Sequence, residues 1–86
     1  MTVKGFAKEC RIELPKNLDK RVLRIPVTSS YSPIYLGRFY GHQLRIDISY
    51  MVIMFGTKDD TQMVFFHEIA HACNYFKGKY RRNHGS

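Results

Sequence analysis

The amino-acid sequence predicts a small α+β domain, a short β-sheet with a hairpin packed on one long helix, and three observations support this fold class. The chain has 86 residues, enough to enclose one hydrophobic core. Its three prolines lie in the first 40 residues, among short strand-like segments. From residue 57 onward, apolar residues recur with helical spacing. We therefore expect residues 1–86 to form a single domain, with residues 78–86 as a tail after the helix.

Two short strands are expected in the first third of the chain. Residues 10–14 alternate polar and apolar side chains, and residues 22–27 are rich in β-branched residues, so each segment predicts a strand that ends near a proline. Pro26 suits an edge strand, because proline has no backbone N–H to donate to a neighbouring strand. Residues 15–21 stay open between a loop and a helical turn.

A β-hairpin is expected over residues 35–49. Gly41 and His42 supply the turn, and the strand after it alternates aliphatic with polar side chains. Period-two geometry directs three aliphatic residues to the core and three polar residues to solvent. The two sets are Leu44, Ile46 and Ile48, and Arg45, Asp47 and Ser49. Residues 50–55 are a continuous apolar run that periodicity assigns to neither helix nor strand.

A long amphipathic helix is expected after Gly56. Residues 57–62 offer several N-cap candidates, and Lys77 and Gly78 suit the C-terminal end. One face is apolar and should pack on the core: it consists of Phe65, Phe66, Ile69, Ala72, Cys73 and Phe76. His67 and His71 lie about 40° apart on the other side, with Glu68 nearby, and these side chains face a cleft or solvent.

Composition narrows the class of protein. Fourteen Lys and Arg against seven Asp and Glu give a formal net charge of +7, which favours contact with nucleic acid, anionic surfaces or acidic proteins. No apolar run approaches the ~20 residues of a membrane span, and the N-terminus lacks a signal-peptide core, so we expect a cytoplasmic protein. Cys10 and Cys73 form no CxxC motif and are expected to be reduced thiols.

The motif that carries chemistry is HExxH at residues 67–71, inside a segment that independently predicts a helix. One helical turn brings His67 and His71 to the same face, so each can offer a ring nitrogen to one Zn²⁺ at about 2.0–2.1 Å. The Glu68 carboxylate is rotated away from the metal and can accept a proton from a zinc-bound water that attacks a peptide carbonyl. The alternative is a pair of solvated histidines on an ordinary amphipathic helix.

A tetrahedral catalytic zinc site needs a third protein ligand. His84 follows His71 by thirteen residues, and a turn after the helix could return it to the same metal. His42, beside Gly41 in the expected hairpin turn, is the rival ligand. The simpler interpretations are a turn residue for His42 and part of a polar tail for His84.

These residues resemble the SprT-like and Spartan zinc metalloproteases. The resemblance rests on HEIAHA at residues 67–72, followed at a similar spacing by His84 and Gly85, and with the upstream hairpin it covers residues 35–86. It implies a zincin-like fold, zinc held by His67, His71 and His84, and Glu68 as the catalytic base. The chain ends two residues after His84, where these relatives continue, so a reduced or truncated version of the fold is implied.

The resemblance also implies protein substrates, in some relatives proteins crosslinked to DNA. The basic residues between the second and third expected ligands suit DNA contact or form a solvated tail: they are Lys77, Lys79, Arg81 and Arg82. HEIAHA also resembles phage-repressor-cleaving proteases, whose third ligand is a later acidic residue, but no acidic residue follows Glu68 here. The rival function is a small basic protein that binds nucleic acid or a host protein without catalysis, with a structural zinc or none.

Overall fold

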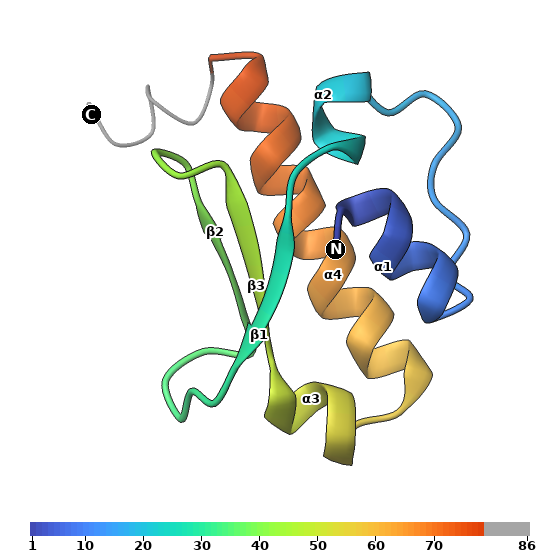
Figure 1. Cartoon of the computed structure of the whole chain (residues 1–86), viewed down its shortest axis with the longest axis vertical. Helices are drawn as coiled ribbons and strands as arrows, with labels where there is room; N and C mark the ends of the chain where they lie inside the picture. Colours follow the sequence, from blue (N-terminus) through green and yellow to red (C-terminus); the bar gives the residue numbers. More distant parts are fainter. Residues whose placement is uncertain (79–86) are drawn as a thin grey trace.

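The long helix α4 (Lys58–Phe76) lies across one face of a three-stranded sheet, with shorter helices beside it (Figure 1). The computed structural model describes residues 1–78. The other elements, in chain order, are α1 (Val3–Glu9), α2 (Lys20–Leu23), β1 (Val27–Ser30), β2 (Gly37–Tyr40), β3 (Arg45–Ser49) and α3 (Tyr50–Phe55). The expected α+β class is confirmed.

The sheet has the strand order β1-β3-β2. Strand β2 runs antiparallel to β3, with Phe39 opposite Ile46, so the hairpin expected over residues 35–49 is confirmed. Strand β1 pairs with β3 in the parallel direction. Because β3 is central, β2 is an edge strand, and one side of it has no strand partner among the described residues.

The prediction of a strand at residues 10–14 is wrong. This segment follows α1, where Cys10 is the C-cap and Arg11 adopts a positive φ of 55°. The Ile12 N–H donates to the Ala7 carbonyl at 2.8 Å, so the chain turns back on the helix and buries Ile12. Alternation over five residues is a weak signal, and here it belongs to the end of a helix.

The prediction of a strand at residues 22–27 is wrong for all of these residues except the last. Val22 belongs to α2, whose N-cap Asp19 accepts the Arg21 N–H at 2.8 Å, and β1 begins only at Val27. The capping carboxylate stabilises a helical turn locally, whereas the strand preference of β-branched residues depends on neighbouring strands. A helical turn does form in this region, at residues 20–23.

The polar side chains of β3, expected to face solvent, are less exposed than strict strand alternation predicts. Ile46 and Ile48 are fully buried as expected, but Asp47 is only 4% exposed and Ser49 is fully buried. Tertiary partners explain the difference, because the Asp47 carboxylate accepts hydrogen bonds from neighbouring hydroxyl groups and Ser49 is the N-cap of α3. Residues 50–55, which periodicity assigned to neither helix nor strand, form the helix that Ser49 caps. Leu44, expected to face the core, lies outside the strand and is 37% exposed.

Helix α4 begins and ends where the sequence predicts. Thr57 and Asp60 form a capping box, Lys77 is the C-cap, and Gly78 follows with a φ of 81°. The apolar face packs on the sheet and on α1, and the Phe65 ring is fully buried. Within residues 1–78, no helix has both the length and the apolar character to cross a membrane.

Candidate metal centre

His67 and His71 lie one turn apart on α4, with their rings side by side. Their Nε2 atoms are 3.2 Å apart, and the ring centroids are separated by 4.7 Å. Two imidazole nitrogens at about 2.0–2.1 Å from one tetrahedral Zn²⁺ stand about 3.3 Å apart. The observed spacing therefore fits two ligands of one zinc ion, and it also suits a hydrogen bond between the rings.

The surroundings of His71 favour its neutral form. His67 is exposed, whereas His71 is half-buried. Burial lowers the pKa of His71, and the positive charge of His67 lowers it further. Because a metal binds the neutral imidazole, a lowered pKa leaves His71 ready to bind a metal ion near neutral pH.

The Glu68 side chain lies in a cleft between α4 and strand β2 and is only 5% exposed. Burial raises the pKa of its carboxyl group, whereas the positive charge of His67 and a hydrogen bond from the Phe39 backbone N–H lower it. A partly desolvated carboxylate whose pKa is raised by burial suits the role of a general base.

Gly37 allows this close packing of β2 on α4. A Cβ atom added at Gly37 would lie 2.5 Å from Val64 Cγ1 and 3.2 Å from Glu68 Cγ. The helix and the strand can therefore approach this closely only where a glycine stands. The sequence prediction did not include Gly37, although a glycine inside a strand often marks such a close backbone approach.

A pocket of about 340 Å³ opens where β2 meets α4. Its lining includes both His67 and Glu68, together with Leu36, Gly37, Met63 and Val64. The pocket lies at β2, the edge strand, and an edge strand can pair with an extended peptide. The His67 imidazole, the buried Glu68 carboxylate and the edge strand β2 thus meet in one place.

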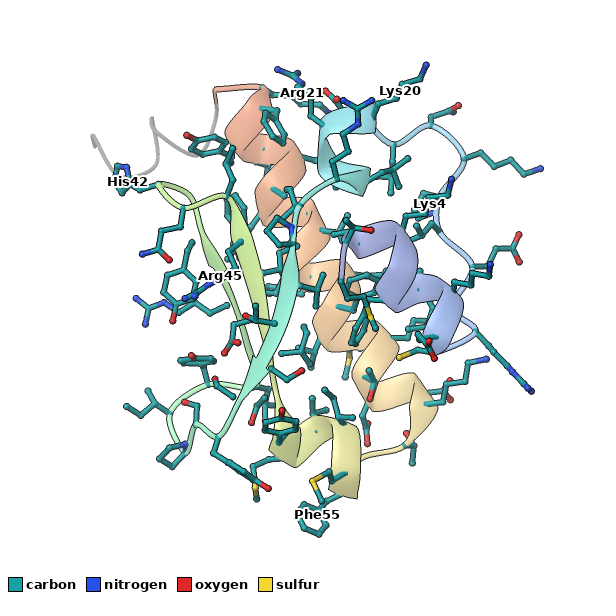
Figure 2. All side chains as sticks on the ribbon, viewed as in Figure 1. Lys4, Lys20, Arg21, His42, Arg45 and Phe55 are labelled. Carbon is teal, nitrogen blue, oxygen red and sulfur yellow. The ribbon has the colours of Figure 1, made fainter. Side chains whose placement is uncertain are left out.

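Two other candidate residues, His42 and Lys77, lie apart from this arrangement. His42 is exposed at the tip of the β2–β3 hairpin (Figure 2). Lys77 is exposed at the end of α4. Within residues 1–78 no group of three or more His, Cys, Asp or Glu side chains is arranged to hold a metal ion, so His42 does not complete the pair. The remaining candidates lie outside the described residues: Lys79, Arg81, Arg82 and His84.

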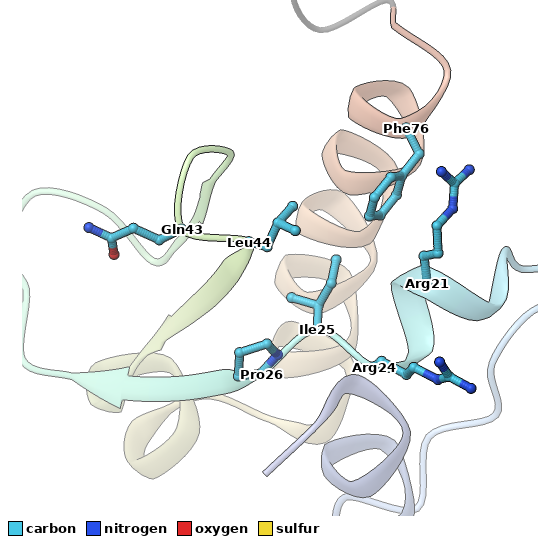
Figure 3. Close-up of a pocket in the computed structure, with 7 residues that line it drawn as sticks. All are labelled: Arg21, Arg24, Ile25, Pro26, Gln43, Leu44 and Phe76. Atoms are coloured by element: carbon cyan, nitrogen blue, oxygen red, sulfur yellow. The ribbon is translucent and has the colours of Figure 1, made fainter.

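A second pocket, of about 410 Å³, lies between α2, the hairpin turn and the end of α4 (Figure 3). The Arg21 guanidinium lies 4.4 Å from the centroid of the Phe76 ring and forms an ion pair with Asp19 at 2.7 Å. Among the described residues, none of the candidate ligands His42, His67 and His71 lines this pocket. The sequence prediction did not indicate it, because its lining comes from segments far apart in the chain.

Comparison with known proteins finds no matching family model, no matching curated protein and no matching solved structure.

Proposed function

We propose that this chain is a zinc-dependent metallopeptidase domain with a zincin-like fold, similar to the SprT-like and Spartan proteases, that acts on protein substrates in the cytoplasm. The supporting observation is the geometry of the HExxH motif. The two Nε2 atoms are 3.2 Å apart, and the neighbouring glutamate is buried in a pocket that the first histidine also lines.

Each side chain of the motif has a distinct role in this proposal. His67 and His71 hold the metal ion together with His84, the third ligand suggested by the sequence. When bound, Zn²⁺ would act as a Lewis acid that polarises a peptide carbonyl and lowers the pKa of a bound water. Glu68 removes the proton from the attacking water and returns it to the amine that leaves. The Phe39 N–H orients the Glu68 carboxylate by donating a hydrogen bond to it.

The substrate is proposed to be an extended protein segment beside β2. Within residues 1–78, one edge of β2 has no neighbouring strand, and an extended peptide can pair with such an edge through main-chain hydrogen bonds whatever its side chains. The basic residues Lys77, Lys79, Arg81 and Arg82 would favour proteins that are bound to DNA.

Replacing Glu68 by Gln tests the catalytic role. This change keeps the shape of the side chain but removes the basic carboxylate, so cleavage of labelled casein should fall by about 10²–10⁴-fold while the zinc content of the purified protein is unchanged. Glu13→Gln, which removes the same charge from an exposed residue, is the matched control and should cleave casein like the wild type.

Two outcomes would remove the proposal. One is retention of cleavage by Glu68→Gln, because no other residue is assigned the proton transfer. The other is a wild-type protein that takes up no zinc. If zinc binds but no protein substrate is cut, the non-catalytic binding protein becomes the better account.

A further inference from the structure

Within residues 1–78, no helix packs on the outer face of the sheet. Helix α4 packs on the opposite face, where Phe39 and Ile46 are buried. Strand alternation directs Arg38, Tyr40 and Arg45 to the outer face. Figure 2 shows the Arg45 side chain on the side of the sheet that is away from α4. This face therefore presents side chains that the core does not use.

Aromatic rings and guanidinium groups alternate across this face. The Arg38 Cζ atom lies 5.2 Å from the ring centroid of Tyr40 and 5.7 Å from that of Tyr35. The Arg45 Cζ atom lies 4.5 Å from the ring centroid of Tyr40. We refer to Tyr35, Arg38, Tyr40 and Arg45 as the Tyr–Arg layer. Contacts of this kind limit the freedom of the guanidinium groups.

The Asp47 carboxylate, which lies beside this layer, is occupied by hydroxyl groups. The Asp47 side chain accepts hydrogen bonds from Thr28 Oγ1 at 2.8 Å and from the Tyr35 hydroxyl at 3.0 Å, and also from the Ser30 hydroxyl. Asp47 is 4% exposed, so its carboxylate oxygens are not open to a ligand at the surface.

The guanidinium groups of the two arginines remain available to bind an anion. Within residues 1–78, neither Arg38 nor Arg45 forms an ion pair with a carboxylate. The Arg45 Nε atom is buried and has no hydrogen-bond partner in the described part of the chain. Guanidinium groups that are ordered by aromatic rings but unpaired suit phosphate oxygens, which accept their N–H groups in a fork geometry.

We propose that the Tyr–Arg layer binds single-stranded nucleic acid. Guanidinium N–H groups would contact the phosphates, while bases stack on the outward faces of the guanidinium planes that the tyrosine rings support. A single strand is favoured over a duplex because stacking requires bases that are free of a partner strand. The net charge of +7 favours the same ligand. This site is separate from the metal centre and stands whether or not the chain cleaves proteins.

Fluorescence anisotropy with a labelled oligothymidylate of about 15 nucleotides tests the site. The double variant R38A/R45A should raise Kd at least tenfold. The slope of log Kobs against log[salt] should become less steep by about 1.4, because each lost phosphate contact removes about 0.7 from it. K4A/K20A is the charge-matched control, because Lys4 and Lys20 lie in α1 and α2, away from the sheet (Figure 2). It should change Kd by less than about threefold.

A further double variant separates stacking from charge. R38K/R45K keeps both positive charges but removes the planar groups, so binding should weaken at least threefold while thermal unfolding stays like that of the wild type. A labelled oligoribonucleotide of the same length distinguishes RNA from DNA as the source of the single strand, and tighter binding of either one supports the site.

Three results would overturn the inference. The first is equal weakening by K4A/K20A and R38A/R45A, which would mean a diffuse charge effect. The second is unchanged binding by R38K/R45K. The third is competition by inorganic polyphosphate or by an acidic peptide as effective as competition by unlabelled oligothymidylate, because neither competitor carries bases that stack.

Discussion

At the scale of single residues, Gly37 is a position where a small change should have a large effect. Adding a methyl group there brings Cβ to 2.5 Å from Val64 Cγ1, and the β-branched Val64 cannot easily move away. We predict that Gly37→Ala lowers the free energy of unfolding by about 1–3 kcal/mol, through overpacking between β2 and α4. Urea unfolding followed by circular dichroism measures this change.

Gly5→Ala is the control for this prediction. A Cβ at Gly5 meets only Met1 Cγ at 3.2 Å and Thr2 Oγ1 at 3.5 Å, and Gly5 lies inside α1, where alanine is favoured by about 0.5–1 kcal/mol. In the double variant G37A/V64A the clash disappears, so its destabilisation should be smaller than the sum of the two single effects. Additive effects would mean that the proposed contact does not govern the packing.

At the scale of elements, the four-residue helix α2 depends on its N-cap. The Arg21 side chain and then the Arg21 backbone N–H donate to the Asp19 carboxylate and lower the pKa of Asp19 to about 2. A helix this short has little stability of its own, so the capping contact decides whether residues 20–23 are helical.

The pH dependence follows from the lowered pKa of Asp19. Because the folded value is below the unfolded value of about 3.9, the stabilisation is fully present above about pH 4 and is lost as the pH falls toward 2. Asp19→Asn keeps a capping side chain but cannot titrate, so the difference in unfolding free energy between wild type and variant should shrink over this interval. A constant difference from pH 5 to pH 2 would contradict the assignment, and Glu9→Gln is the charge-matched control.

At the scale of the whole molecule, the short chain makes its stability sensitive to any ligand that binds only the folded state. A domain of 86 residues buries a modest fraction of its surface, so a ligand that binds only the folded state adds substantially to the free energy of unfolding. Zinc at a hundred times its Kd should add about 2.7 kcal/mol. For a domain of this size, each kcal/mol raises Tm by about 4–8 °C.

Differential scanning fluorimetry with and without Zn²⁺ measures this shift. His67→Ala and His71→Ala should abolish it, and His84→Ala should reduce it strongly, whereas His42→Ala should leave it unchanged because His42 lies at the hairpin tip. A shift lost in His42→Ala but kept in His84→Ala would move the third ligand to the hairpin. The absence of any zinc-dependent shift in the wild type would contradict the metal site.

The hairpin and α4 were predictable because their signals are local. Thr57 and Asp60 form a capping box across three residues, and Gly78 follows the C-cap with a left-handed φ. The first third of the chain was not predictable in the same way. The alternation of residues 10–14 suggests a strand, yet Thr2 and Asp19 cap short helices on either side of that segment, and their contacts outweigh a weak periodic signal.

By itself, the sequence determined that His67 and His71 share one face of a helix and that Glu68 stands beside them, because one turn of helix depends only on neighbours in the chain. Only the tertiary structure decided that the Phe39 N–H donates to Glu68 and that hydroxyl groups donate to the buried Asp47 carboxylate. It also decided that the Tyr–Arg layer faces away from the core. These contacts depend on the order of strands in the sheet and on the side that α4 covers, and no local pattern of residues encodes either one.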